Sequence, residues 1–411
     1  MINVSRHQLP NGLKIVHSYD GATAMVAVNL LYGVGARNES PDFTGLAHLF
    51  EHLMFGGSAN IPDFDANIEL AGGKNNAWTS NDFTNFYDII PAQNVETAFW
   101  LESDRMMALA FSDKALEVQR SVVIEEFKQQ CLNRPYGDES HYLRRAAYSA
   151  HPYQWPVIGK EIGHIEKVTQ NDVRDFFYRH YGPDNAILSV AGNITFEETI
   201  RLAEKWFGPI PSIGFKKPAL PAEPEQIAPK ICEATGRVPA TDIIVAYKME
   251  GYGTEQYFAA DLITDLLANG QSSRFYRNLL VATDIFSAVD ASIVGSEDPG
   301  LLLVHARLAE EGAEAEARAM EAMHDEIKRL TECHVSEHEL ARALNRMESA
   351  QMFENLSYMA KAQNLALAEY HSEDINARMG IYRALTPEAI ADHASRIFRP
   401  ENATTLFYRP Q

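Results

Sequence analysis

The chain is poor in cysteine and has no long hydrophobic run. Its three cysteines, Cys131, Cys232 and Cys333, are widely spaced and form neither a C-x-x-C motif nor an even set for disulfides, which favours a reducing compartment. No stretch approaches the roughly 18 consecutive apolar residues of a membrane-spanning helix. Residues 1–7 lack the basic segment and apolar core of a secretory signal. We therefore expect a cytoplasmic protein, or a periplasmic one from which a signal has been removed.

Basic residues are in the minority. Lysine and arginine number 36 against 56 aspartates and glutamates, which gives a net charge of −20. Binding to nucleic acid or to an anionic membrane depends on clustered Lys and Arg, and the sequence contains no such cluster. We expect neither partner. The length of 411 residues, with 46% hydrophobic and 22% charged residues, predicts a globular protein of two or more domains.

One apolar run, residues 47–55, contains the motif H-x-x-E-H. The run has no glycine or proline and is expected to form a helix. On a helix His48 and His52 lie one turn apart on the same face, where both imidazoles can bind a single ion. Glu51 stays close to that face and can act as a general base toward a water on the metal. Unpaired polar side chains are costly in an apolar run, so the pattern favours a bound cation over chance.

The segments around this helix predict a sheet. We expect strands within residues 8–20 and 24–32, and Thr44 as the cap of the metal-binding helix. Two further strands are expected at 76–80 and 84–90. Their mixture of Thr, Asn and aromatic residues suits either a sheet edge that an extended peptide joins, or an ordinary hairpin with a solvated face.

A third metal ligand is needed, because catalytic zinc sites usually have three protein ligands. The helix expected at 113–132 contains Glu117, Glu125 and Glu126, and the residues alone do not choose among them. His151 and His164 are expected to be structural, since neither shares a helical face with another histidine.

The two halves of the chain are related. A proline-rich linker at 209–229 separates an N-terminal domain, 1–208, from a C-terminal domain, 230–411. In each half an expected helix is followed by a short Pro-acid-Asn-Ala segment and then by an expected strand. The segment is PDNA at 183–186 in the first half and PENA at 400–403 in the second, an offset of 217 residues. We predict an α+β fold of two similar domains, each a mainly antiparallel sheet packed with helices.

The second half has no metal-binding motif. Its matching helix, expected at 257–267, lacks H-x-x-E-H, so only one metal site is predicted. Residues 270–273 lack the lysine of a phosphate-binding loop and are expected to form a turn. Helices are expected at 312–331, 336–369 and 387–397.

Several segments together resemble the insulinase/pitrilysin family of zinc peptidases, in the short two-domain form that includes the mitochondrial processing peptidase. The resemblance covers essentially the whole chain. The segments that carry it are HLFEHLMF at 48–55, NAWTS at 76–80, QRSVVIEE at 119–126 and YGPDNA at 181–186.

The resemblance implies a zinc-dependent endopeptidase that acts on peptides or small unfolded polypeptides. Arg120 and Val122 align the family's third zinc ligand with Glu126, which follows His52 by 74 residues, and Glu125 is the fallback. Gln119 stands where the family has a glutamate that orients this site. By resemblance, Asn76, Ala77 and Trp78 lie on the edge strand that binds the substrate.

The resemblance also implies a gap in the substrate site. Family members bind the substrate backbone with an arginine and a tyrosine from the metal-free domain, and these positions are Leu280 and Ser287 here. We hypothesise that another chain supplies the pair, as a metal-free subunit does in some two-domain relatives. The expected assembly is a homodimer or a heterodimer with a metal-free family subunit. Some relatives are non-catalytic scaffolds or peptide-binding subunits, but these usually lack motif residues that this chain retains.

Overall fold

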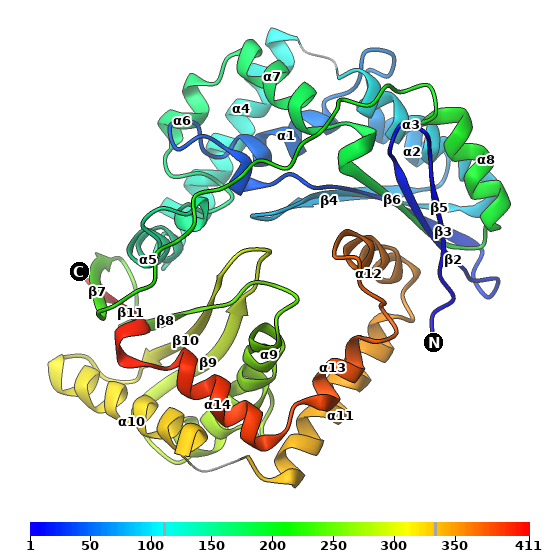
Figure 1. Cartoon of the computed structure of the whole chain (residues 1–411). Helices are drawn as coiled ribbons and strands as arrows, with labels where there is room; N and C mark the ends of the chain where they lie inside the picture. The colour runs from blue at the N-terminus through cyan, green and yellow to red at the C-terminus, as the bar shows by residue number, and fades with distance from the viewer. Residues whose placement is uncertain (110–111, 333–334) are drawn as a thin grey trace. The chain divides into compact units, whose positions relative to one another are not determined.

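The computed structural model describes residues 1–109, 112–332 and 335–411, so Cys333 lies outside the described residues. The chain divides into two compact units, each built from three separate segments, and Figure 1 shows their elements. Unit 1 comprises Met1–Phe127, Trp155–Leu220 and Gln351–Ala377, and unit 2 comprises Lys128–Gln154, Pro221–Ala350 and Arg378–Gln411.

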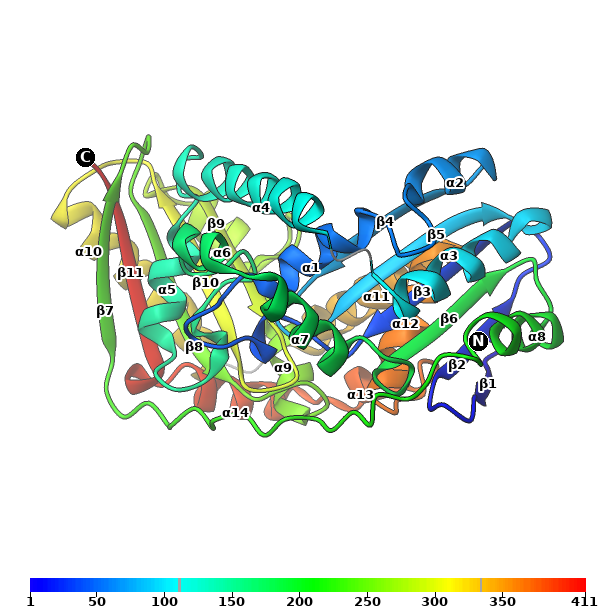
Figure 2. The same cartoon turned by 90° about the horizontal axis from the view of Figure 1, so that it is seen from above.

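Unit 1 contains a six-stranded sheet in the order β1-β2-β6-β3-β5-β4. Strands β2 and β6 pair in parallel, and the other four pairings are antiparallel. Strand β4 forms one edge, and helix α1 packs beside it, as Figure 2 shows. The strands are β1 Ser5–Gln8, β2 Lys14–Tyr19, β3 Met25–Tyr32, β4 Lys74–Thr79, β5 Thr84–Pro91 and β6 Ala186–Gly192.

Both faces of the unit 1 sheet are buried, which explains the nearly continuous apolar sequence of β3. Val28 and Leu30 contact the main core under α1, α3, α7 and α8, whereas Leu31 belongs to a second cluster with Leu365 and Ala366 of α12. The helices are α1 Leu46–Phe55, α2 Phe64–Leu70, α3 Glu96–Met107, α4 Asp113–Phe127, α6 Ile162–Lys167, α7 Gln170–His180, α8 Phe196–Trp206 and α12 Tyr358–Tyr370.

Unit 2 contains a five-stranded sheet in the order β7-β11-β8-β10-β9, again with one parallel pair, β7 with β11. Ile243 and Val245 of β8 contact α9, α10 and α14, and Ile244 faces Leu143 of α5 on the opposite side. The strands are β7 Lys230–Gly236, β8 Asp242–Met249, β9 Phe286–Val294, β10 Gly300–Leu308 and β11 Ala403–Pro410. The helices are α5 Glu139–Ala147, α9 Glu255–Ala268, α10 Ala313–Glu332, α11 Glu337–Glu354, α13 Arg378–Ala384 and α14 Pro387–Ile397.

The structure confirms the predicted duplication. Helix α7 and strands β3 and β6 of unit 1 correspond to α14, β8 and β11 of unit 2, and each first residue is displaced by the predicted 217 positions. The strand orders of the two sheets also match, apart from the additional β1 in unit 1. The predicted fold class, two similar α+β units with mainly antiparallel sheets, is therefore confirmed.

The units differ from the expected continuous ranges, 1–208 and 230–411, by an exchange of helices. Helix α5 lies in the first half of the sequence but packs on the unit 2 sheet, and α12 lies in the second half but packs on the unit 1 sheet. The prediction of a single helix at 336–369 is also wrong, because this segment forms two helices, α11 and α12. It is interrupted after Glu354, and the Ser357 side chain accepts a hydrogen bond from Ala360 N to begin α12.

None of the described helices combines the length and the apolar character that crossing a bilayer requires.

Candidate metal centre

Helix α1 is held at its N-terminus by a buried carboxylate. Glu39 accepts hydrogen bonds from the backbone nitrogens of Gly45, at 2.9 Å, and Ala47, at 2.8 Å. Burial raises the pKa of Glu39 to about 8, and these two hydrogen bonds oppose the rise. The prediction that Thr44 caps this helix is wrong, because the N-cap residue is Gly45. The Thr44 hydroxyl instead accepts a hydrogen bond from Lys160 N at 2.8 Å.

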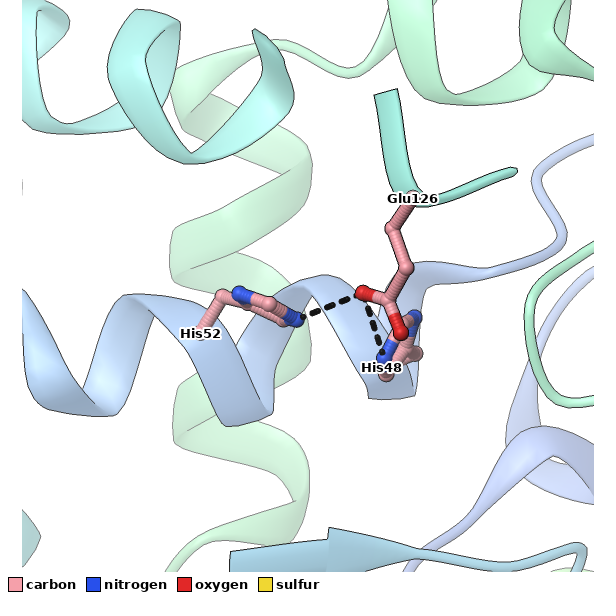
Figure 3. Close-up of side chains that lie close together, drawn as sticks. All are labelled: His48, His52 and Glu126. Atoms are coloured by element: carbon pink, nitrogen blue, oxygen red, sulfur yellow. Dashed lines mark ion pairs between the residues drawn. The ribbon is translucent and has the colours of Figure 1, made fainter. Parts of the chain in front are cut away.

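His48 and His52 lie on one face of α1, and Glu126 of α4 reaches them from above, as Figure 3 shows. The two ring centroids are 4.9 Å apart. Glu126 Oε2 lies 3.5 Å from His48 Nε2 and 3.2 Å from His52 Nε2. One ligand atom from each residue therefore falls within 4.8 Å of the other two.

This arrangement fits a tetrahedral zinc ion. Ligands about 2.1 Å from such an ion lie about 3.4 Å from one another, which is close to both measured separations. The His48 side chain is 12% exposed, and burial lowers its pKa to about 4. The neutral imidazole, which has a free lone pair for a metal, is therefore the favoured form.

The structure distinguishes the three candidate glutamates. Glu117 pairs with Arg120 at 2.6 Å and its side chain is 68% exposed, so it does not reach the histidines. Glu125 is exposed, whereas Glu126 is the carboxylate in the described group with His48 and His52. A five-residue π-helix, Lys128–Leu132, follows directly after α4, and such local distortions are frequent at functional sites.

Gln119, on α4, replaces the orienting glutamate expected from the resemblance. Its Nε2 lies near Gly56, the residue that ends α1, at 3.8 Å from the position of a Cβ built on that glycine. The amide thus lies close to the end of α1.

Glu51 is on the same helix as both histidines, and its carboxylate is fixed from the edge strand. Thr79 Oγ1, at the end of β4, donates a 2.6 Å hydrogen bond to Glu51 Oε2. Burial raises the pKa of Glu51, and the bond from Thr79 opposes that rise.

The sequence alone did not assign a role to Thr79, although the residue lies in the NAWTS segment. The alternation of a strand was the available signal. Ala77 packs against the core that contains α1, whereas Trp78 packs against the cluster on the opposite face. Thr79 therefore returns to the face of Ala77 and of the metal-binding helix.

The predicted substrate-binding residues Asn76, Ala77 and Trp78 all lie on β4, at the edge of the sheet. Asn76 Oδ1 accepts a 2.8 Å hydrogen bond from Ala77 N, so a side chain satisfies this backbone donor. Their role in binding stays a prediction.

The positions expected for the arginine and tyrosine pair are in unit 2. Leu280 ends the π-helical turn Tyr276–Leu280 and packs against the unit 2 core. Ser287, on β9, donates 3.3 Å hydrogen bonds to the carbonyl oxygens of Arg307 and Leu308. Neither side chain offers a charge or a phenol to a peptide.

A second group of possible ligands, Glu139, Asp242 and His305, lies in unit 2. Arg307 donates to both Asp242 oxygens at 2.7 Å, and His305 Nε2 lies 2.9 Å from Asp242 Oδ2. The guanidinium already supplies the positive charge that a metal would bring. Asp242, His305 and Arg307 therefore form an ion-pair cluster.

Two family models match the chain. The model described as Insulinase (Peptidase family M16) matches residues 14–161, which include His48, His52 and Glu126, and the model described as Peptidase M16 inactive domain matches residues 167–347. The chain belongs to the insulinase family. The name of the second model agrees with the lack of an H-x-x-E-H motif in the second half.

Relatives within the insulinase family extend over most of the chain. A zinc protease, PqqE, of Helicobacter pylori is 28% identical and is aligned over 98% of this chain and 92% of its own. An uncharacterised zinc protease of Bacillus subtilis is 24% identical over 85% and 84% of the two chains. The beta subunit of the mitochondrial processing peptidase of Saccharomyces cerevisiae is 27% identical over 62% and 55%.

Solved structures of family members share the fold. The crystal structure of a protease from Helicobacter pylori has a TM-score of 0.92 at 25% identity, and the match covers all of both chains. An M16 inactive domain from Pseudomonas fluorescens has a TM-score of 0.90 at 16% identity over 100% and 99% of the chains, which supports the fold alone.

Proposed function

We propose that the chain is a zinc-dependent endopeptidase in which His48, His52 and Glu126 bind the ion and Glu51 is the general base. The observation that carries the proposal is that two imidazoles of α1, the helix that also bears Glu51, converge within 4.8 Å with one carboxylate from α4. The zinc proteases among its relatives support the same metal.

The metal and Glu51 have different roles in the proposed reaction. Zinc, when bound, lowers the pKa of water and polarises a carbonyl group. Glu51 Oε2 is occupied by the hydrogen bond from Thr79, which leaves Oε1 to take a proton from water and return it to the departing amine. Because burial raises the pKa of Glu51, its carboxylate is a stronger base than an exposed glutamate.

The substrate class follows from the edge strand. Strand β4 has β5 on one side and is the last strand of its sheet, so an extended peptide can add to it through main-chain hydrogen bonds. The addition would displace the Asn76 side chain from Ala77 N. We infer that short or unfolded polypeptides are cleaved, because a segment that adds to β4 along the cleavage site must be free of other main-chain pairing.

A pair of variants tests the proposal. Glu51→Gln keeps the three ligands and is expected to retain zinc while peptide hydrolysis is lost, whereas His52→Ala is expected to lose both. Zinc content is measured by elemental analysis, and cleavage of a peptide library is measured with and without a chelator. Retained hydrolysis in Glu51→Gln would rule out the mechanism.

A partner chain is the second part of the proposal. Because leucine and serine stand at positions 280 and 287, where relatives have arginine and tyrosine, we infer that a metal-free subunit supplies these groups. The match of residues 167–347 to the model described as an inactive domain favours an alternative function, a scaffold or peptide-binding subunit without catalysis of its own. Hydrolysis by the purified chain at the rate of a reconstituted complex would exclude the partner requirement. Peptide binding without hydrolysis in both preparations would support the alternative.

A further inference from the structure

Unit 2 contains a polar cavity that lies apart from its β-sheet. The cavity has a volume of about 350 Å³ and lies among the turn that precedes the π-helix Tyr276–Leu280, the end of α10 and the start of α11. Its lining residues are Ser272, Arg274, Arg277, Asn278, Glu326, Arg329, Ser336, His338, Glu339 and Arg342.

Arginines dominate this lining, although the chain as a whole carries a net charge of −20. Two of the four arginines have partners. Arg274 donates to both oxygens of Glu339, at 2.8 and 3.0 Å, and Arg329 donates to Glu326 at 3.0 Å. These ion pairs hold two guanidinium groups in place and neutralise the two glutamates.

The other two arginines are not neutralised in this way. Among the described residues, no hydrogen-bond acceptor and no carboxylate within 4 Å engages the side chain of Arg277 or Arg342. Four arginines against two glutamates leave the lining with two positive charges. The cavity therefore favours a ligand with two negative charges.

Uncharged groups in the cavity also favour an anion. Ser272 and Asn278 contribute polar side chains, and the Ser336 hydroxyl accepts from Glu339 N at 3.2 Å as the cap of α11. The positive end of this 18-residue helix is thus directed at the cavity. The lining contains no tyrosine, tryptophan, phenylalanine or large aliphatic residue, so its surface is mainly polar.

We propose that this cavity binds a small phosphate-bearing dianion. Guanidinium forks match the oxygens of a phosphate group, and a phosphate monoester is a dianion above its second pKa of about 6. Residues 270–273, which lack the lysine of a phosphate loop, border the cavity through Ser272, and the cations come from residues 274, 277, 329 and 342 instead. The site is independent of the metal centre.

The test measures binding of inorganic phosphate at pH 8 to the whole chain, by calorimetry and by the rise in Tm, against sodium chloride at matched ionic strength. Saturable binding by the wild-type chain is expected. Arg277→Gln and Arg342→Gln are each expected to weaken Kd about tenfold, because each removes a charged hydrogen-bond donor. The Tm of each variant without phosphate shows whether it is folded, and Arg277→Lys, which keeps the charge without the fork, is expected to bind with intermediate Kd.

The matched control is Arg237→Gln, which removes an exposed positive charge of the same unit outside the cavity and is expected to leave Kd unchanged. Equal weakening by this control, or a phosphate effect no larger than that of chloride, would overturn the proposal. Succinate provides the carboxylate arm, and tighter binding of succinate than of phosphate would contradict the phosphate assignment. Glu51→Gln is expected to bind phosphate as the wild-type chain does, so the outcome is separate from that of the peptidase proposal.

Discussion

Helices α1 and α9 follow equivalent strands of the two units, but their polar side chains are satisfied in different ways. On α9, Asp261 accepts a 2.6 Å hydrogen bond from the Tyr382 hydroxyl, and Asp265 pairs with Arg346. On α1, His48 and His52 face Glu126. The two aspartates of α9 are thus paired with a hydroxyl donor and a positive charge. Around α1, by contrast, two imidazoles and one carboxylate lie together, and all three can offer lone pairs.

This difference separates the structural role of α9 from the metal-binding role proposed for α1. A buried carboxylate beside an arginine or tyrosine has its charge or its hydrogen-bonding capacity satisfied, and such pairs stabilise the packing of α9. A set of neutral imidazoles with one carboxylate is complete only with a cation or with protons, and burial disfavours protonation of His48. The comparison can be tested by removing one member from each set.

The largest effect is expected for Glu126→Ala. Loss of one of three ligands should weaken zinc binding by more than the roughly 10- to 100-fold that follows loss of an outer hydrogen-bond partner, and peptide hydrolysis should fall with it. Zinc affinity is measured by competition with a chromogenic chelator. The control is Glu125→Ala, an exposed neighbour on the same helix, which should retain zinc and activity. If the two variants exchange these outcomes, the ligand is Glu125.

The corresponding change in unit 2 is Asp265→Ala. It leaves Arg346 without its partner, and we expect the free energy of unfolding to fall by about 1 to 3 kcal/mol with no loss of zinc. Urea unfolding and metal analysis measure the two quantities. The control is Asp392→Ala, because the Asp392–Arg396 pair is exposed on both sides and should contribute less than about 1 kcal/mol. Loss of zinc in Asp265→Ala would show that α9 also serves the metal centre.

Each unit also holds its own end of the proline-rich segment with one carboxylate. In unit 1, Asp184 accepts hydrogen bonds from Ser212 Oγ at 2.7 Å and from Phe215 N at 2.7 Å. In unit 2, Glu223 accepts from Lys248 Nζ at 2.7 Å and from the backbone nitrogen of His151 at 3.0 Å. The segment is therefore anchored at both ends, rather than free as its composition alone suggests.

The anchor in unit 2 predicts a pH dependence. Burial by itself would raise the pKa of Glu223. The hydrogen bonds from Lys248 and the backbone outweigh that effect and lower the pKa to about 2, from an ordinary value of 4.5. Its contribution to stability is therefore complete above about pH 4.5 and is lost as the pH falls toward 2. Glu223→Gln should lower the free energy of unfolding by about 1 to 2 kcal/mol at pH 7 and remove this part of the acid dependence. Glu225→Gln, whose side chain is 72% exposed, should change neither quantity.

The sequence was sufficient for features that depend on local pattern. The helix with H-x-x-E-H and the 217-residue repeat follow from spacing and self-similarity, whereas the edge position of Ala77 followed only from the family resemblance. The choice of Glu126 over Glu125 and Glu117 needed the family resemblance. All three glutamates lie on one helix, and the sequence does not show which side chain points toward the histidines. The structure places the Glu126 carboxylate beside His48 and His52, which supports the same choice.

The exchange of α5 and α12 between the units was beyond sequence reasoning. An amphipathic helix such as α12 shows which of its faces is buried, through Ala362 and Leu365, but not which sheet covers that face. Glu39 was missed for a similar reason. It lies six residues before Gly45, and only the folded loop brings its carboxylate to the start of α1.

The smallest effect is expected for Thr79→Val, which removes the hydroxyl that fixes Glu51 Oε2 and keeps the shape of the side chain. Burial raises the pKa of Glu51, and without the opposing hydrogen bond the pKa rises further. A general base must be deprotonated, so the acid limb of the kcat/KM profile should move to higher pH. At neutral pH we expect kcat/KM to fall about threefold to tenfold, which corresponds to the loss of one hydrogen bond. The same substitution at Thr235, on an edge strand of the metal-free unit, should leave the profile unchanged. An acid limb that stays in place in Thr79→Val would show that the hydroxyl only supports packing between β4 and α1.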